Sequence, residues 1–208
     1  MKALIVVDLQ YDFLPGGALA VPQGDAVIAV ADKLSRSFEH VFATQDWHPP
    51  QHQSFASQHP GKKPGEVIDL HGLTQVLWPD HCVQGTRGAK LVGTFPWPSQ
   101  TETIRKGQDP MVDSYSGFFD NGQRRATELE SRLRAAKATE VFVMGLATDY
   151  CVKFTALDAL RLGFHTTLVR DGCRGVDLRP GDSDRAIDEM KRAGVVITTS
   201  DELLRGLT

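Results

Sequence analysis

Cys151 is the residue of this sequence with the clearest capacity for nucleophilic chemistry. It follows an apolar run, 141–144, with the length and β-branched character of a buried strand, and Gly145 then permits a tight turn. Apolar residues recur at helical spacing from Tyr150 until Gly163, which predicts an amphipathic helix with Cys151 in its first turn. The unpaired amides and the dipole of a first turn favour a thiolate, the reactive form of cysteine. The alternative is a small buried hydrophobic side chain, which describes most unpaired cysteines.

A second set of residues has the chemistry of a metal site. Asp46 and His48 stand two residues apart just after a predicted strand, and His81 offers another imidazole from a long loop. One carboxylate and two histidines, without a thiolate, suit Zn, Fe or Mn and leave room for water or substrate. His52 is a further candidate ligand, for which the alternative is an ordinary polar side chain in a solvated loop.

Asp8 and Lys106 each lie at the end of a predicted strand. Taken alone, the aspartate would be a turn or capping residue and the lysine an exposed side chain. A cysteine nucleophile, however, needs a group that removes its proton and a positive charge that balances the negative charge of its thiolate. An ammonium group and a carboxylate beside Cys151 would provide both, because Lys106 would lower the thiol pKa and Asp8 would carry the proton.

The order of predicted elements indicates an α/β fold, because strands alternate with helices along the whole chain. We expect a three-layer sandwich with a central, mostly parallel six-stranded sheet and helices on both faces, in a single domain over residues 1–208. The predicted strands cover 2–9, 41–44, 101–106, 141–144, 165–169 and 195–198. The predicted helices are one capped by Asp25 and reaching Leu34, one over 123–136, one from Tyr150 to Leu162, and one over 182–192.

Ligands of such sheets bind at the carboxyl ends of the strands. That rule brings five chemically capable residues to one rim of the sheet: Asp8, Asp46, His48, Lys106 and Cys151. The region 46–99 is dense in Pro, Gly, His and Gln and shows little periodicity. Because a long loop in a compact domain usually carries function, we expect this region to hold the metal site.

Composition narrows the kind of partner. The net charge of -3 comes from 26 acidic and 23 basic residues that are interspersed, without the basic stripe of a nucleic-acid or membrane-binding surface. We therefore expect a small-molecule partner, no nucleic acid and no membrane. The first residues are too short an apolar run for a signal peptide, and no later run is long enough to span a bilayer, so we expect a cytoplasmic protein. Three cysteines in such a chain do not suggest a disulfide framework.

Six short segments occur in the order in which a known family carries them. They are VDLQYDFLPGG (7–17), QDWHP (45–49), WPDHCVQGT (78–86), KG (106–107), DSYSGF (113–118) and GLATDYCV (145–152). Through these segments the chain resembles the nicotinamidases, also called pyrazinamidases, within the isochorismatase-like cysteine hydrolases. The resemblance runs from Ala3 to about Asp171.

The resemblance implies a triad and a metal. In this family the positions that match Asp8, Lys106 and Cys151 form the catalytic triad. The positions that match Asp46, His48 and His81 bind one divalent ion, usually zinc, with iron and manganese as alternatives, and the ion contacts the pyridine nitrogen of nicotinamide.

The resemblance also implies a ring pocket and an oxyanion hole. The aromatic residues that wall the ring pocket are matched by Phe13, Trp78 and Tyr115, although an ordinary core position is an alternative for Phe13. The backbone amides at Ala147 and Cys151 match the oxyanion hole, and the Leu146–Ala147 peptide matches a cis bond. Family roles cannot be assigned to two positions in the same way. The fourth metal ligand varies in the family, which leaves His52 a candidate ligand. Tyr150 stands where other members can carry histidine.

These observations together predict a metal-dependent amidohydrolase. It would convert nicotinamide and water into nicotinate and ammonia through a cysteine thioester, as a step of NAD salvage, and would also accept pyrazinamide. One alternative is another amide hydrolase of the isochorismatase-like group, and a second is a non-catalytic binding protein stabilised by its metal. The sequence leaves the identity of the ion and the oligomeric state open.

Overall fold

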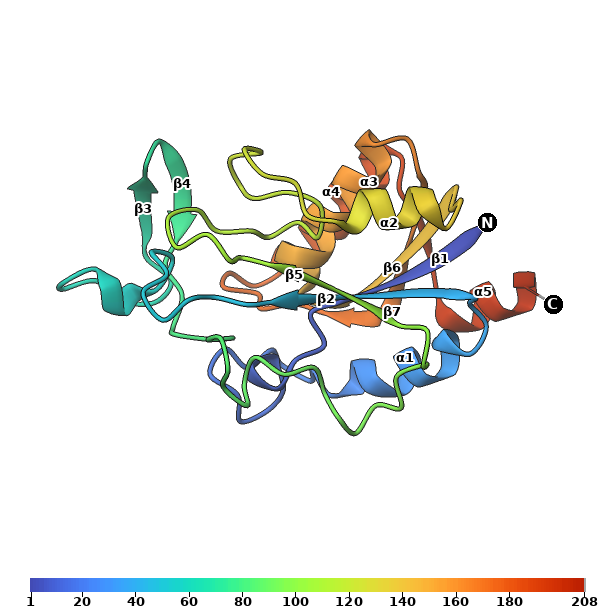
Figure 1. Ribbon diagram of the computed structural model, residues 1–208, viewed down its shortest axis with the longest axis horizontal. Coiled ribbons are helices and arrows are strands. Elements are labelled where there is room, and N and C mark those ends of the chain that lie inside the picture. The colour runs from blue at the N-terminus through green and yellow to red at the C-terminus, as the bar shows by residue number, and fades with distance from the viewer. Residues whose placement is uncertain (208) are drawn as a thin grey trace.

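The computed structural model describes residues 1–207 and is built around a six-stranded sheet in the order β5-β2-β1-β6-β7-β8 (Figure 1). Every neighbouring pair in this sheet is parallel. The strands are β1 (Lys2–Val7), β2 (His40–Asp46), β5 (Glu102–Lys106), β6 (Glu140–Leu146), β7 (His165–Arg174) and β8 (Val196–Thr198). The central strands are nearly continuous apolar runs because helices cover both of their faces.

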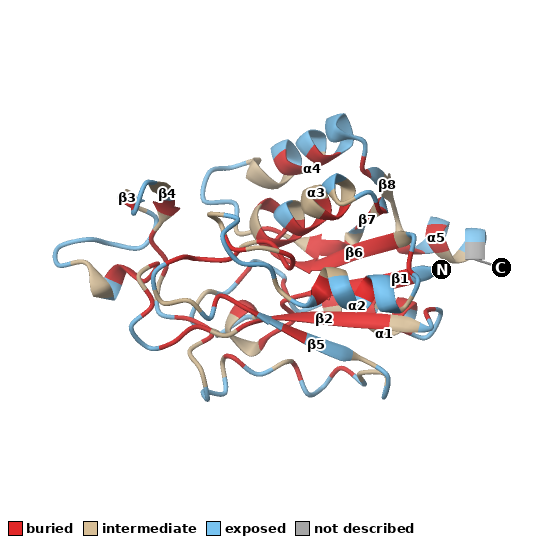
Figure 2. Cartoon of the chain, turned by 45° about the horizontal axis from the view of Figure 1, so that its top comes forward, coloured by how far each residue is buried: buried red, intermediate tan, exposed pale blue. Residues whose placement is uncertain are grey.

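Helices form the two outer layers. They are α1 (Ala26–Ser35), α2 (Leu129–Ala135), α3 (Lys153–Arg161), α4 (Asp182–Ala193) and α5 (Ser200–Leu207). Helices α1 and α5 lie on one face of the sheet, and α2, α3 and α4 lie on the other (Figures 1 and 2). The predicted three-layer α/β sandwich is therefore confirmed. Buried residues of all layers form one continuous hydrophobic cluster, from which we infer a single domain. None of the helices in the described part of the chain is long and apolar enough to cross a bilayer.

All six predicted strands are present, but one predicted helix is about half as long as expected. The helix expected over 123–136 begins only at Leu129. The Asp120 carboxylate accepts hydrogen bonds from the backbone amides of Arg124 and Arg125, which holds the chain in a turn. The Thr127 hydroxyl then accepts from the amide of Leu129, so local side-chain hydrogen bonds displace the first helical turns. The final helix, α5, was not predicted at all.

Two smaller expectations also differ from the structure. Asp25 precedes α1 but makes no capping hydrogen bond with its side chain. The region 46–99 is not wholly irregular, because it contains an antiparallel hairpin of β3 (Val67–Leu70) and β4 (Leu73–Val76). His71 and Gly72 both have positive φ at the turn, as in a type I′ hairpin connection. The strands lack apolar alternation, so periodicity could not reveal them.

The sheet topology determines where a site can form. The strand order reverses between β1 and β6, and ligands of doubly wound sheets bind at such a switch point. Asp46 and Lys106 are register partners at the ends of β2 and β5, while Asp8 directly follows β1. Gly145 in β6 has a φ of 124° and packs against the backbone of Val7 in β1.

We expect Gly145→Ala to be strongly destabilising. A Cβ at this position would overlap the Val7 carbonyl, and the positive φ adds a cost of its own. The two effects should lower the free energy of unfolding by about 2 to 5 kcal/mol, measured by urea titration. Gly163→Ala is the matched control, because Gly163 also has positive φ but open space around it, and it should cost about 1 to 2 kcal/mol. Equal losses in the two variants would contradict the packing argument.

Candidate active site and metal centre

The Lys106 ammonium group is the centre of a buried polar cluster at the switch point. Its Nζ donates hydrogen bonds to Asp46 Oδ1 at 2.6 Å, to the Ser114 carbonyl at 2.8 Å and to Cys151 Sγ at 3.4 Å. It also forms an ion pair with Asp8 Oδ2 at 2.9 Å. The structure thus brings together the three residues of the predicted triad, with Asp46 as a fourth member.

Asp8 is held in place by a neighbouring strand. Its backbone has a φ of 48° just after β1, a conformation that aspartate tolerates better than most residues. The hydroxyl of Thr44 in β2 donates to Asp8 Oδ1 at 2.6 Å and accepts from the Asp8 amide at 3.1 Å. The Lys106 ammonium lies 2.9 Å from the other carboxylate oxygen, Asp8 Oδ2. A carboxylate oxygen of Asp8 and the Cys151 sulfur lie within 4.8 Å of each other, so Asp8 is placed to receive a proton from the thiol.

Cys151 lies at a helix start, although the local geometry differs from the expected α-helical turn. Thr148–Val152 form one π-helical turn, and α3 begins only after it. The Ala147 carbonyl accepts two amide hydrogen bonds from this turn. The Leu146–Ala147 peptide is cis, as the family resemblance implied. This turn presents the sulfur to the Lys106 ammonium from the end of β6.

Burial and the charges of the cluster shift the pKa values of its two carboxylates in opposite directions. Burial raises the pKa of Asp8, and the Lys106 ammonium offsets only part of this rise. Burial also acts on Asp46, but there the Lys106 ammonium and His48 prevail and hold the pKa well below its usual range. Burial raises the pKa of the Cys151 thiol, and Lys106 lowers it as expected but not enough to compensate. The resting thiol therefore keeps its proton, contrary to a preformed thiolate, and Asp8 is the carboxylate suited to proton transfer.

Asp46, His48 and His81 form the cluster predicted to hold a metal. One ligand atom of each lies within 4.8 Å of the others, and Asp46 Oδ2 is 3.6 Å from His48 Nε2 and 4.0 Å from His81 Nε2. The Nδ1 atoms of the two histidines contact the carbonyls of Gly107 and Pro79, both at 2.8 Å. A carbonyl can only accept, so each Nδ1 carries the hydrogen and each Nε2 is directed to the cluster. This donor set fits a divalent ion.

His52 is buried beside this cluster, and the alternative of a solvated surface histidine is wrong. It is 0% exposed, its Nδ1 contacts the Ser54 hydroxyl at 2.7 Å, and its Nε2 has no partner within residues 1–207. Together with His48 and Asp113 it forms a second group of close ligand atoms. Asp113 is buried and was given no role from the sequence. Its only signal there was its position in a family-like segment.

The histidine charges agree with a cation site. Burial and the neighbouring His48 lower the pKa of His52 and of His81 to about 4, so both are neutral at pH 7, as metal ligation requires. Burial would also lower the pKa of His48, but the Asp46 carboxylate outweighs it and raises that pKa. The Asp46 carboxylate thus favours a positive charge at His48.

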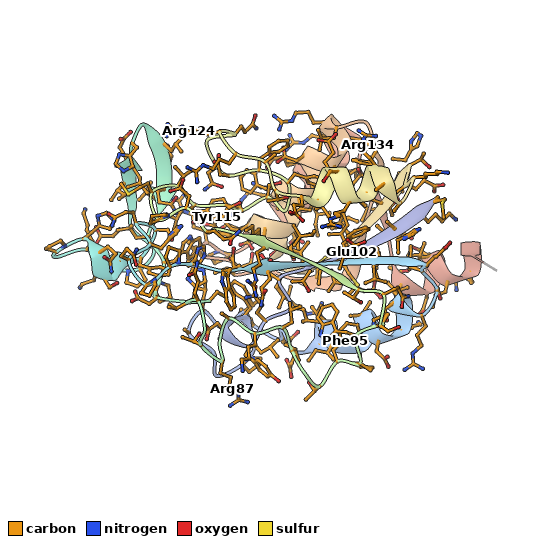
Figure 3. All side chains as sticks on the ribbon, in the orientation of Figure 1. Arg87, Phe95, Glu102, Tyr115, Arg124 and Arg134 are labelled. Carbon is orange, nitrogen blue, oxygen red and sulfur yellow. The ribbon has the colours of Figure 1, made fainter. Side chains whose placement is uncertain are left out.

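A small hollow, which we call the ring cavity, adjoins Cys151. All three predicted aromatic residues line it, together with Asp46, His81, Asp113, Leu19, Ala147, Tyr150, Cys151 and Val176. The hydroxyl of Tyr115 accepts a hydrogen bond from Trp78 Nε1 at 3.2 Å, which joins two of the aromatic walls. Tyr115 lies in the half of the molecule that carries the hairpin (Figure 3). Sequence reasoning assigned no place in the cavity to Leu19, Tyr150 or Val176.

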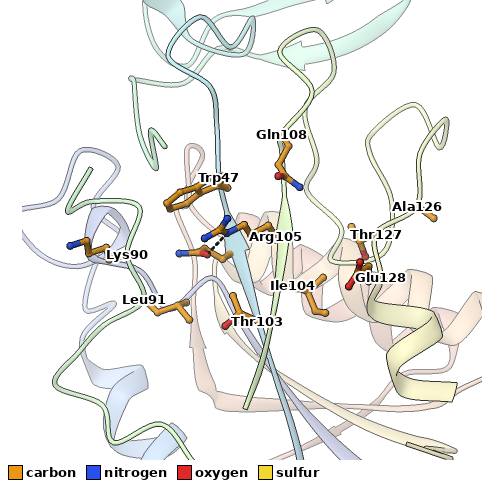
Figure 4. Close-up of a pocket in the computed structure, with 11 residues that line it drawn as sticks. Trp47, Lys90, Leu91, Thr103, Ile104, Arg105, Gln108, Ala126, Thr127 and Glu128 are labelled. Atoms are coloured by element: carbon orange, nitrogen blue, oxygen red, sulfur yellow. Dashed lines mark hydrogen bonds between the residues drawn. The ribbon is translucent and has the colours of Figure 1, made fainter. Parts of the chain in front are cut away.

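A larger hollow of about 780 Å³ runs along the edge strand β5 (Figure 4). Trp47 and Arg105 line it, with the guanidinium stacked 4.2 Å from the indole ring. Side chains alternate along a strand, so these residues point away from their neighbours Asp46 and Lys106. Neither triad nor metal-cluster residues line this hollow, and it is separate from the site.

Comparisons with known proteins agree with the geometry. The isochorismatase domain family matches residues 2–202. The chain is 52% identical over 203 residues to a nicotinamidase of Escherichia coli (strain K12), covering 95% of this chain and 94% of the relative. A nicotinamidase and pyrazinamidase of Acinetobacter baumanii has a similar solved structure, with a TM-score of 0.94, 44% identity and 97% coverage of each chain. The pyrazinamidase of Pyrococcus horikoshii, solved in complex with zinc, has a TM-score of 0.78 and 40% identity, covering 95% of this chain and 98% of its own.

We expect Lys106→Met to destabilise the protein by about 3 to 5 kcal/mol, because it leaves two buried carboxylates without a counter-charge. Denaturant unfolding measures the loss. Lys62→Met is the matched control: Lys62 is exposed and pairs with Glu66, four residues away in a turn, so its loss should cost at most about 0.5 kcal/mol. A small loss in Lys106→Met would show that the carboxylates are not held by the ammonium.

We expect the protein to bind about one divalent ion per chain, and His48→Ala to lose it, because this variant removes one of three buried ligands. Elemental analysis of dialysed protein measures the metal content. His71→Ala, in the exposed hairpin turn, is the control that should retain the ion. Unchanged metal content in His48→Ala would place the ion elsewhere.

Proposed function

This chain belongs to the isochorismatase family, and on that basis we propose that it is a nicotinamidase, which hydrolyses nicotinamide to nicotinate and ammonia. Pyrazinamide, an aromatic amide of the same size, is its proposed second substrate. The observation that carries the proposal is the buried Lys106 ammonium, which joins a thiol, a general base and a metal-ligating carboxylate in one cluster. We propose Asp8, Lys106 and Cys151 as the catalytic residues.

In the first half of the reaction, Cys151 Sγ attacks the amide carbon while its proton passes to Asp8. The backbone amides of Ala147 and Cys151 are proposed to hold the oxyanion, because Cys151 lies in the turn that presents the sulfur and Ala147 directly precedes that turn. Asp8 then gives the proton to the departing nitrogen, the carbon–nitrogen bond breaks, and ammonia leaves behind a thioester. The raised pKa of Asp8 suits a group that both accepts and donates this proton.

In the second half, water attacks the thioester carbon and Asp8 accepts a proton from it. The carbon–sulfur bond breaks, nicotinate is released, and the proton returns from Asp8 to Cys151. Lys106 stabilises the negative charge that moves between sulfur and carboxylate, because its ammonium contacts both Cys151 and Asp8. Each step needs only groups of the buried cluster and one water molecule.

Asp46, His48 and His81 are the proposed metal ligands, with His52 as a further candidate. When bound, a divalent ion would supply positive charge that orients the pyridine ring and polarises nearby water. Phe13, Trp78 and Tyr115 are proposed to pack on the ring. Zinc is the first choice for the ion, supported by the zinc complex of the similar pyrazinamidase, with iron and manganese as alternatives.

We expect metal-replete protein to release ammonia from nicotinamide, and Cys151→Ala to lower this rate by at least about 10⁴-fold, because no other group can form the thioester. A coupled ammonia assay measures the rate, and calorimetry should still detect nicotinamide binding. Cys173→Ala is the matched control: Cys173 is buried in β7, outside the ring cavity, and its thiol donates a hydrogen bond to the Val169 carbonyl. Ammonia release by Cys151→Ala would contradict the assignment of Cys151 as the nucleophile. A wild-type protein that releases no ammonia from nicotinamide would contradict the proposed substrate.

A further inference from the structure

The ring cavity is too small for a substrate ring as it stands. Its volume is about 20 Å³, enough for roughly one water molecule. A benzene-sized ring needs on the order of 150 Å³. A wall of the cavity must therefore move when an aromatic amide binds.

A much larger open groove lies on the other side of that wall. This outer groove has a volume of about 750 Å³ and runs between the β3–β4 hairpin and helices α3 and α4. Exposed apolar side chains line it, namely Val67, Phe154 and Leu178. Tyr115 and Tyr150 are the two residues that line both the groove and the ring cavity, so they form the partition.

The two tyrosines are held very differently. The Tyr115 hydroxyl accepts hydrogen bonds from Gln75 Nε2 at 3.1 Å and from Trp78 Nε1 at 3.2 Å. The Tyr150 hydroxyl has no hydrogen-bond partner in the described part of the chain, and the residue is half-buried. Its ring meets Trp78 and Tyr115 edge to face, with centroids 4.8 Å and 5.3 Å away. Such contacts are weak, so Tyr150 is the side of the partition that can turn.

The other partly exposed walls are poorer candidates. Leu19 and Val176 line the ring cavity but not the outer groove, so their movement would not join the two spaces. Phe13 and Trp78 are almost fully buried.

We propose that Tyr150 is the movable wall of the ring cavity and the residue that determines how large a substrate ring can be. Its side chain turns toward the outer groove to admit a flat aromatic amide, then closes over the ring. A substituent that projects past Tyr150 prevents closure, which excludes bulky aromatic amides. The substrate class in this inference rests on the proposed function.

The selectivity test uses Tyr150→Phe, Tyr150→Leu and Tyr150→Ala. The quantity measured is kcat/KM for nicotinamide carrying a phenyl group at C5 or C6, divided by kcat/KM for nicotinamide. We expect this ratio to rise by about tenfold or more in Tyr150→Ala, less in Tyr150→Leu, and to stay at the wild-type value in Tyr150→Phe. Phe154→Ala removes a ring from the groove but not from the partition and should keep the wild-type ratio. An unchanged ratio in Tyr150→Ala, or in Tyr150→Leu if the alanine variant does not fold, would overturn the proposal.

A second measurement does not depend on nicotinamide turnover. Alkylation of Cys151 by a small reagent, iodoacetamide, is compared with alkylation by a bulky one, pyrene maleimide, using mass spectrometry to assign the site. Tyr150→Ala should raise the relative rate of the bulky reagent by about tenfold, because the partition no longer shields the sulfur. Cys82 and Cys173 are buried outside the cavity and serve as internal controls. An unchanged relative rate would overturn the movable wall even if the protein is a nicotinamidase, and a raised rate would support it even if the protein is not.

Discussion

The buried ammonium of Lys106 is the interaction on which the rest of the site depends. Two carboxylates from neighbouring strands, Asp8 and Asp46, are both removed from water, which costs several kcal/mol per ion unless an opposite charge is close. Lys106 meets both at 2.9 Å or less and also contacts Cys151. One cation therefore holds three strand ends and a cysteine in a fixed arrangement. With Asp46 kept ionised, it is Asp8 whose charge can change during a reaction.

Asp46 connects this cluster to the metal centre. Its Oδ1 accepts from Lys106, while its Oδ2 faces the Nε2 atoms of His48 and His81. A cation bound by the histidines would thus share a carboxylate with the groups beside Cys151. Because interactions between buried charges are poorly screened, binding of a cation there would be coupled to the charge state of the Lys106 cluster. The backbone of Asp46 is held in turn by the Gln10 side chain, which bonds its amide and its carbonyl at 2.8 Å.

The prediction from sequence is correct where a residue stands at or just after the end of a predicted strand. The strands that end at Asp46 and Lys106 are recognisable from their own residues, and a parallel sheet brings their ends together. It is wrong where local side-chain hydrogen bonds replace a helix, or where a strand carries no apolar pattern. The polar segment 123–128 has helical residues, but the Asp120 carboxylate binds its amides and keeps it in a turn. The β3–β4 hairpin is mostly exposed and lacks the alternation that reveals a strand.

The sequence by itself determined the fold class and the family. It also indicated the candidate site residues, because each of them lies in a local pattern or a family-like segment: Asp8, Asp46, His48, His81, Lys106 and Cys151. Only the tertiary structure decided that His52 is buried beside the metal cluster, that Asp113 joins it, and that Tyr150 separates the ring cavity from the outer groove. These facts depend on contacts between segments that are distant in the chain. Neither periodicity nor spacing records such contacts, since they arise from how loops pack over the ends of the sheet.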